Sequence, residues 1–138
     1  MGDGQGVVVQ ASLALDLVNA HITSVIDGKI YHRIHNSQTT QGAFVTPAET
    51  AGQGDPDSVA SDLGQVRLVY IQEDTSGGVG REIIESRLSG GTFLDPDNLS
   101  LNANDEQSPK VAQDINGIFH AVWSRSGESV SDIVHYTS

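Results

Sequence analysis

Carboxylate side chains gather in the polar segments that separate the apolar runs of this sequence. Residues 47–56, 72–81, 95–108 and 124–131 carry Glu49, Asp55, Glu73, Asp74, Asp95, Asp97, Asp105, Glu106 and Glu128. Oxygen ligands of this kind suit Ca²⁺ or a cationic ligand. The candidate ligand-binding residues are therefore Glu73, Asp74, Asp97 and Asp105, with Trp123 as an aromatic surface on which a sugar would stack. The alternatives are an ordinary solvated acidic face and a Trp123 packed between sheets.

Other site chemistries lack their sequence patterns. The chain has no Cys, which excludes thiolate metal sites and a Cys nucleophile. Its five histidines show no His-x-x-x-His spacing, and no Gly-x-Ser-x-Gly elbow occurs. Gly77-Gly78-Val79-Gly80 falls in an expected hairpin loop rather than between a strand and a helix. We therefore expect no catalytic residue, no cofactor and no metal, with Ca²⁺ as the one ion the acidic segments would suit.

The negative net charge of the chain limits the classes of partner that it can bind. Seven Lys and Arg against 18 Asp and Glu give a net charge of −11 over 138 residues. An acidic protein repels phosphate backbones and anionic lipid surfaces, so neither nucleic acid nor a membrane is an expected partner. No apolar run reaches the length of a membrane span, and the first residues lack the basic start of a signal peptide. We expect a soluble protein, and its compartment cannot be read from the sequence.

An internal repeat organises the chain. Residues 56–71 and 109–123 both read as Pro, a short strand with Val-Ala, an Asp-led turn and an apolar strand, and residues 12–26 form a fainter copy. The repeated acids are Asp16, Asp62 and Asp114. Each precedes a turn in which its carboxylate can accept backbone N–H bonds, which indicates a structural role.

Each repeat predicts four short strands. In the second copy they are residues 58–61, 66–71, 82–88 and 92–94, where β-branched and aromatic residues are bounded by Gly, Asp, Asn and Ser. Residues 12–20 could form a short helix by propensity, but alignment with the other copies favours a strand. Four-stranded units of this length predict an all-β chain of three β-propeller blades, approximately 11–56, 57–108 and 109–138 within a single unit 1–138. A β-sandwich is the alternative.

The repeat resembles the blades of sialidase-like propellers with Asp-box turns. It keeps Pro-x-Val-Ala-x-Asp, an apolar strand ending in an aromatic, and Gly-x-Phe, whereas the stretches 37–44 and 89–93 keep the Ser, Gly and aromatic of the Asp-box without its Asp. The resemblance implies a propeller fold. The family's activity requires an Arg triad, an acid/base Asp and a Glu-activated Tyr, and none can be assigned to a residue here. Arg33 and Arg87 occupy matching repeat positions, which predicts that they stabilise blades.

Three blades cannot close a ring alone, because propellers have four to eight. The last copy has no outer strand, while residues 7–10 form an apolar strand ahead of the first copy. We therefore predict a homodimer of six blades, in which residues 7–10 of one copy complete the last blade of the other. The rival is that the chain is part of a longer propeller.

Two functions follow from this reading. The first is a non-catalytic propeller scaffold that binds a glycan or a protein on its acidic loop rim. The alternative is a sialidase-like glycoside hydrolase, or a fragment of one. The sequence favours the first and leaves open whether the protein is an enzyme, because the catalytic set of the family cannot be placed.

Overall fold

The computed structural model describes residues 8–36, 44–45, 52–61, 64–73, 80–89, 92–94, 96–100, 105–126 and 131–138. These residues form strands and turns without a helix, which confirms the all-β prediction, and residues 12–15 are strand as the repeat indicated. Within this described part, no helix has the length and hydrophobicity to span a membrane.

Three antiparallel sheets follow one another along the chain. The first contains β1 (Val8–Leu15), β2 (Ala20–Ile26), β3 (Lys29–His35) and β4 (Phe44–Val45) in that order. The second contains β5 (Gln53–Ala60), β6 (Val66–Glu73), β7 (Arg81–Ser89) and β8 (Thr92–Phe93), and the short β9 (Asp97–Asn98) also pairs with β7. The third contains β10 (Asp105–Gln113), β11 (Phe119–Ser126) and β12 (Ser131–Thr137).

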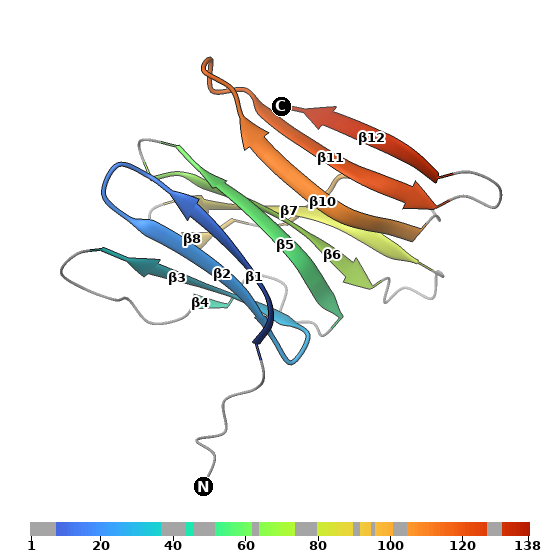
Figure 1. Cartoon of the computed structure of the whole chain (residues 1–138), viewed down its shortest axis with the longest axis horizontal. Helices are drawn as coiled ribbons and strands as arrows, with labels where there is room; N and C mark the ends of the chain where they lie inside the picture. The colour runs from blue at the N-terminus through green and yellow to red at the C-terminus, as the bar shows by residue number, and fades with distance from the viewer. Residues whose placement is uncertain are drawn as a thin grey trace, which may run out of the picture.

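The first strands of the three sheets lie side by side, and each sheet fans outward from them (Figure 1). We call β1, β5 and β10 the inner strands. Asp57 on β5 joins them, because it accepts a hydrogen bond from Ser12 Oγ at 3.2 Å and from the Val111 amide at 2.9 Å. Successive meander sheets packed face to face around their first strands are a β-propeller-like arrangement.

Alternation of side chains along the strands builds the two layers of core between the sheets. Val25 and Ile30 of the first sheet pack with Leu68 and Tyr70 of the second, and all four are buried. On the opposite face of the second sheet, a second cluster combines Val69, Ile71 and Ile83 with Phe119, Ala121 and Trp123 of the third sheet. The middle sheet is thus apolar on both faces and is covered on both sides.

The repeated Asp residues cap turns as the sequence predicts. Asp16 Oδ1 accepts hydrogen bonds from the amides of Val18 and Asn19, both at 2.7 Å. Asp114 Oδ1 accepts them from the amides of Asn116 and Ile118, at 2.8 and 2.9 Å. Asp62, the third member, lies outside the described residues.

The expected N-terminal strand exchange is wrong for residues 8–10. These residues are the start of β1, and Val8 and Gln10 pair with Ile26 and Val25 of the same sheet. These residues therefore belong to the first sheet of their own chain, where they pair with β2 along one side.

The matching of Arg33 with Arg87 is also wrong, by one residue. Arg33 pairs with Ile22, the third residue of β2, whereas Arg87 pairs with Arg67, the second residue of β6. A shift of one residue puts the two side chains on opposite faces of their sheets. The matching of His32 with His135 holds, because both pair with the fourth residue of the preceding strand.

Candidate functional site

Each inner strand carries a β-bulge near its start. The register shifts between Val8 and Gln10 in β1, between Gly54 and Asp57 in β5, and between Gln107 and Lys110 in β10. A bulge leaves one residue out of the ladder and re-aims its side chain. The bulges also explain how Pro56 is accommodated within β5, since a proline cannot donate to the ladder.

Two of these bulge residues have unusual backbone conformations. The φ of Asp55 is 44° and that of Ser108 is 51°, in the left-handed region that non-glycine residues rarely occupy. Gln10, Asp55 and Ser108 each lie five residues before the last residue of their strand. Asp55 and Ser108 fall inside the register shifts, whereas Gln10 pairs with Val25 beside the shift in β1. Strained backbone of this kind is concentrated at functional sites, which makes the bulges the first place to look for one.

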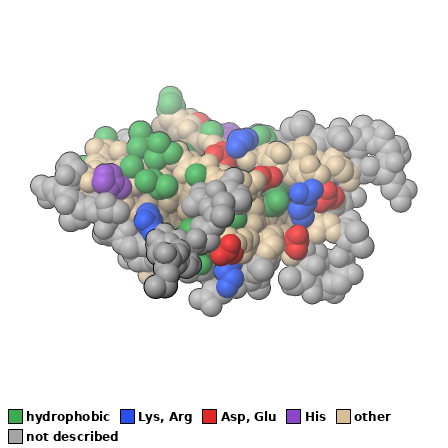
Figure 2. Space-filling view, turned by 60° about the horizontal axis from the view of Figure 1, so that its bottom comes forward, with side chains coloured by type: hydrophobic (Ala, Val, Ile, Leu, Met, Phe, Trp, Pro, Cys, Tyr) green, Lys and Arg blue, Asp and Glu red, His purple; other side chains and the backbone are tan. Residues whose placement is uncertain are grey.

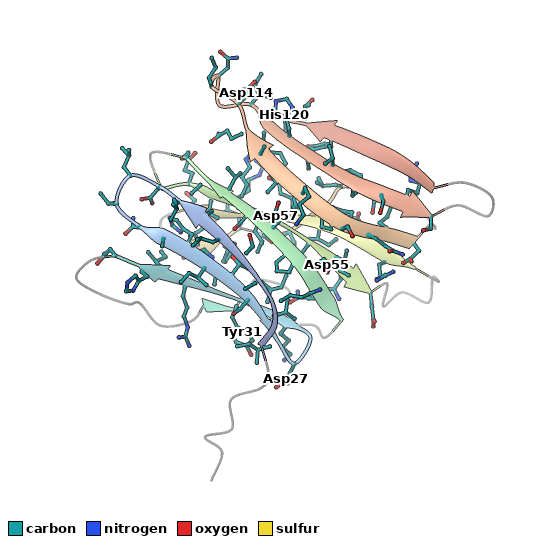
Figure 3. All side chains as sticks on the ribbon, viewed as in Figure 1. Asp27, Tyr31, Asp55, Asp57, Asp114 and His120 are labelled. Atoms are coloured by element: carbon teal, nitrogen blue, oxygen red, sulfur yellow. The ribbon has the colours of Figure 1, made fainter. Side chains whose placement is uncertain are left out.

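The bulges surround a pocket of about 250 Å³, which we call the axial pocket because it lies on the inner strands. Its lining consists of Gln10, Ala11, Asp55, Pro56, Ser108 and Lys110. All three sheets contribute, each through its inner strand. Asp55 and Asp57 both lie on β5, between β1 and β10 (Figure 3).

Hydrogen bonds hold the polar groups of the axial pocket in place. The Asp55 amide donates to Gln10 Oε1 at 2.7 Å, and Gln10 Nε2 donates back to Asp55 Oδ1. Behind them, Asp57 Oδ1 lies 4.0 Å from the ammonium of Lys110. A carboxylate, a primary amide, a hydroxyl and an ammonium thus face one pocket, and together they can both donate and accept hydrogen bonds.

One acidic candidate, Asp105 at the start of β10, is neutralised by Arg81 at the start of β7. Arg81 Nε and Nη2 donate to the two Asp105 carboxylate oxygens at 2.8 and 2.7 Å. Hydrogen bonds from Arg81 lower the pKa of Asp105 to about 2, against the opposing effect of burial. The nearby charges of Asp55 and Glu73 help to raise the pKa of Arg81.

The remaining candidates are dispersed. Glu73 is exposed at the end of β6, and Asp97 lies in β9 with its carboxylate 3.6 Å from Arg87. Trp123 is 3 % exposed in the core between the second and third sheets, which is the packing alternative rather than a sugar platform. Asp74 lies outside the described residues. Glu73, Asp97 and Trp123 do not line the axial pocket.

Most arginines of the described part are paired with carboxylates. Glu85 Oε1 accepts from Arg67 and Arg87 at 3.1 Å each, Glu106 Oε1 accepts from Arg125 at 3.0 Å, and Asp105 binds Arg81. Arginines engaged in this way are not disposed to grip a substrate carboxylate, so the residues described do not form the arginine cluster that the sialidase resemblance would require.

A buried polar chain lies between the first and second sheets. His21 Nε2 donates to Asp16 Oδ2 at 2.8 Å, its Nδ1 lies 3.3 Å from His32 Nε2, and Thr23 Oγ1 lies 3.1 Å from His32 Nδ1. The ring of His32 meets Phe93 of the second sheet edge-on. Burial, with the neighbouring His21, lowers the pKa of His32 to about 4. His21, Thr23 and His32 are at most 1 % exposed, so this chain supports packing rather than a ligand.

No group of three or more His, Cys, Asp or Glu close enough to hold a metal ion occurs within the described ranges.

Comparison with known proteins yields a fold relationship. No family model matches the chain, and no curated protein matches it by sequence. Among solved structures, the endo-arabinase from Bacteroides thetaiotaomicron VPI-5482 superposes with a TM-score of 0.62 at 17 % identity. The match covers 94 % of this chain and 55 % of the endo-arabinase, so the chain spans about half the length of that protein. At this identity the similarity supports the β-fold alone and does not extend to sialidase-specific motifs.

Sequence reasoning placed the site at the loops and missed the axial pocket. The sequence indicated Asp55 only as one of several acidic loop residues, and it did not indicate Gln10, Ser108 or Lys110 as site residues. One signal was available: Pro56 and Pro109 interrupt segments that otherwise read as inner strands, and a proline there indicates a bulge.

Proposed function

We propose that this protein is a propeller scaffold that binds a neutral glycan at the axial pocket. The observation that carries the proposal is the convergence of three bulged inner strands on one polar pocket. Hydrogen-bonding groups fixed by a rigid scaffold are what a hydroxyl-rich ligand needs, since its affinity depends on donors and acceptors that are already in position.

The charges of the site favour a neutral sugar over an anionic one. Asp55 and Lys110 oppose each other in the lining, while the chain as a whole carries −11. The described arginines that would attract a sugar carboxylate are mostly paired already. A sialylated or uronic ligand would therefore meet repulsion from the acidic chain, with Lys110 as the single cation of the pocket lining to offset it.

The binding test uses a panel of neutral oligosaccharides, arabinose-containing ones among them, with sialylated glycans as the charged comparison. We expect binding of neutral members only, and loss of that binding in Asp55→Asn and Gln10→Ala. Asp27→Asn is the matched control, because Asp27 has a similar φ of 50° and lies outside the pocket lining. Equal binding by Asp55→Asn, Gln10→Ala and the unmodified protein would contradict the proposal.

Glycoside hydrolysis is the second candidate, and the superposition on an endo-arabinase favours it. Hydrolysis needs a pair of carboxyl groups on either side of the scissile bond, one of them protonated. Asp55 is the carboxylate in the pocket lining. Asp57, 4.0 Å from the lining residue Lys110, is already committed to Ser12 and the Val111 amide. Release of reducing sugar ends that stops in Asp55→Asn would favour this candidate over simple binding.

The same proposal includes a closed ring of six blades made by two copies. Propellers contain four to eight blades, and the only multiple of three in that range is six. Two identical chains related by a two-fold axis are the commonest closed assembly. Such a dimer would have twice the 14.6 kDa mass of the chain, which sedimentation or light scattering measures directly.

A further inference from the structure

In the part of the chain that the structure describes, no sheet packs on the outer face of the first sheet or on that of the third. We call the side of a sheet on which the preceding sheet of the chain packs, or would pack, its back face, and the opposite side its front face. On the back face of the first sheet, Leu13, Leu15 and Ile22 are 62, 64 and 39 % exposed. Leu13 pairs directly with Ile22, so these side chains are neighbours on one surface. Figure 2 shows hydrophobic side chains gathered toward the end of the molecule where Figure 1 places the first sheet.

Matching positions in the later sheets show what such a face is built to contact. Ile22, Leu68 and Ala121 are each the third residue of the second strand in their sheet. Leu68 is fully buried against the first sheet, and Ala121 is fully buried against the second. In the second and third sheets, the back face is thus covered by the front face of the preceding sheet. The first sheet has no preceding sheet in the structure.

The front face of a sheet is likewise buried when a following sheet packs on it. Thr23, Val69 and Val122 are each the fourth residue of the second strand. Thr23 and Val69 have no exposed surface, since the next sheet covers them, whereas Val122 is 37 % exposed. Among the described residues, the front face of the third sheet is therefore uncovered at Val122 and its cross-strand neighbour Lys110. The back face of the first sheet is uncovered at Leu13, Ile22 and the neighbouring Arg33.

We infer that the front face of the third sheet packs on the back face of the first sheet of a second copy, with Val122 facing Ile22. The joint repeats the contact between the second and third sheets, in which Val69 and Ala121 share one buried cluster. It continues an interface that the chain makes twice internally, and two copies form it twice, which closes six blades without strand exchange. The inference rests on the six-bladed ring proposed above and specifies its contact surface.

Charge exchange across the joint tests this geometry. Ile22→Asp places a carboxylate beside Arg33, and Val122→Lys places a second ammonium beside Lys110. Each variant must desolvate these charges in both joints of its dimer, and each should weaken dimerisation at least about a hundredfold. A one-to-one mixture of the two variants retains one native joint and gains one Asp–Lys joint. We expect this mixture to recover a mass of twice 14.6 kDa, while each variant alone stays at 14.6 kDa.

The control is Leu94→Asp, which adds the same charge at a leucine 50 % exposed beyond β8 and outside both end faces. It should remain dimeric, and circular dichroism checks that every variant is folded. A monomeric unmodified protein would overturn both the ring and the joint. A dimer that survives Ile22→Asp, or a mixture that stays monomeric, would overturn the joint alone. Glycan binding, measured separately, tests the axial pocket.

Discussion

Protonation of His32 should make the protein sensitive to mild acid. The side chain has no exposed surface and lies among His21, Thr23 and Phe93, and its pKa falls from 6.5 to about 4 because burial disfavours the charged ring. The unfolded chain takes up this proton near pH 6.5, and the folded chain resists it until about pH 4. Stability is therefore complete above pH 6.5 and is lost progressively as the pH falls from 6.5 to 4.

The size of the loss follows from the two pKa values. One pKa unit corresponds to about 1.4 kcal/mol, so the whole window is worth roughly 3 kcal/mol and the step from pH 7.5 to pH 5 about 2 kcal/mol. For a domain of this size that step would lower the midpoint of urea unfolding by roughly 1–2 M. Such a loss is a large part of the 5–15 kcal/mol that holds a typical domain folded.

Urea titrations at pH 7.5 and 5 measure the effect in the unmodified protein and in His32→Gln. Because glutamine does not titrate, we expect the variant to lose most of the pH dependence, whatever its stability at neutral pH. His35→Gln is the control, since it removes an exposed histidine from the same strand. An unchanged difference between the two pH values in His32→Gln would refute the assignment.

Three further perturbations test the scaffold. Asp57→Ala should lower the free energy of unfolding in urea by about 1–3 kcal/mol, because it leaves the Val111 amide without its acceptor. Lys110→Ala should lower it by less than about 0.5 kcal/mol, because the Lys110 side chain is 68 % exposed. Trp123→Ala should cost about 3–5 kcal/mol by the same measurement, and an effect below about 1 would contradict its place in the core. Arg81→Gln should raise the pKa of Asp105 from about 2 toward its ordinary value in an NMR titration. Since both side chains are about one-third exposed, the stability that this pair adds above pH 4 should stay below about 1 kcal/mol and should disappear as the pH falls toward 2.

The sequence predicted the class of fold because the signals for strands are local. Runs such as 66–71 combine apolar and β-branched residues, and the repeated Asp caps recur at each turn. Strand ends were less predictable: the inner strand expected at 58–61 begins at Gln53, because a bulge carries the ladder past Gly54 and Pro56. A bulge depends on the partner strand, so the residues of one strand do not specify it.

The site was less accessible to sequence reasoning for a similar reason. Asp55 is bonded to Gln10, 45 residues earlier, and Asp57 to Ser12 and Val111, and each contact joins two different sheets. Asp16 and Asp114 were predicted correctly because their partners lie within four residues. Charge density alone pointed to the loops, whereas Asp105 is the first residue of β10 and is held by Arg81.

The bulges also separate the recognition of a ligand from the stability of the frame. Gln10, Asp55 and Ser108, each five residues before the end of its strand and at or beside its bulge, carry three unrelated side chains, while the strands around them keep the same pairing order. Backbone geometry, rather than any one side chain, brings this position to the pocket. A repeat duplicated within a gene can therefore diversify at this position copy by copy, and each exchange alters the ligand surface while leaving the buried faces of the sheets intact.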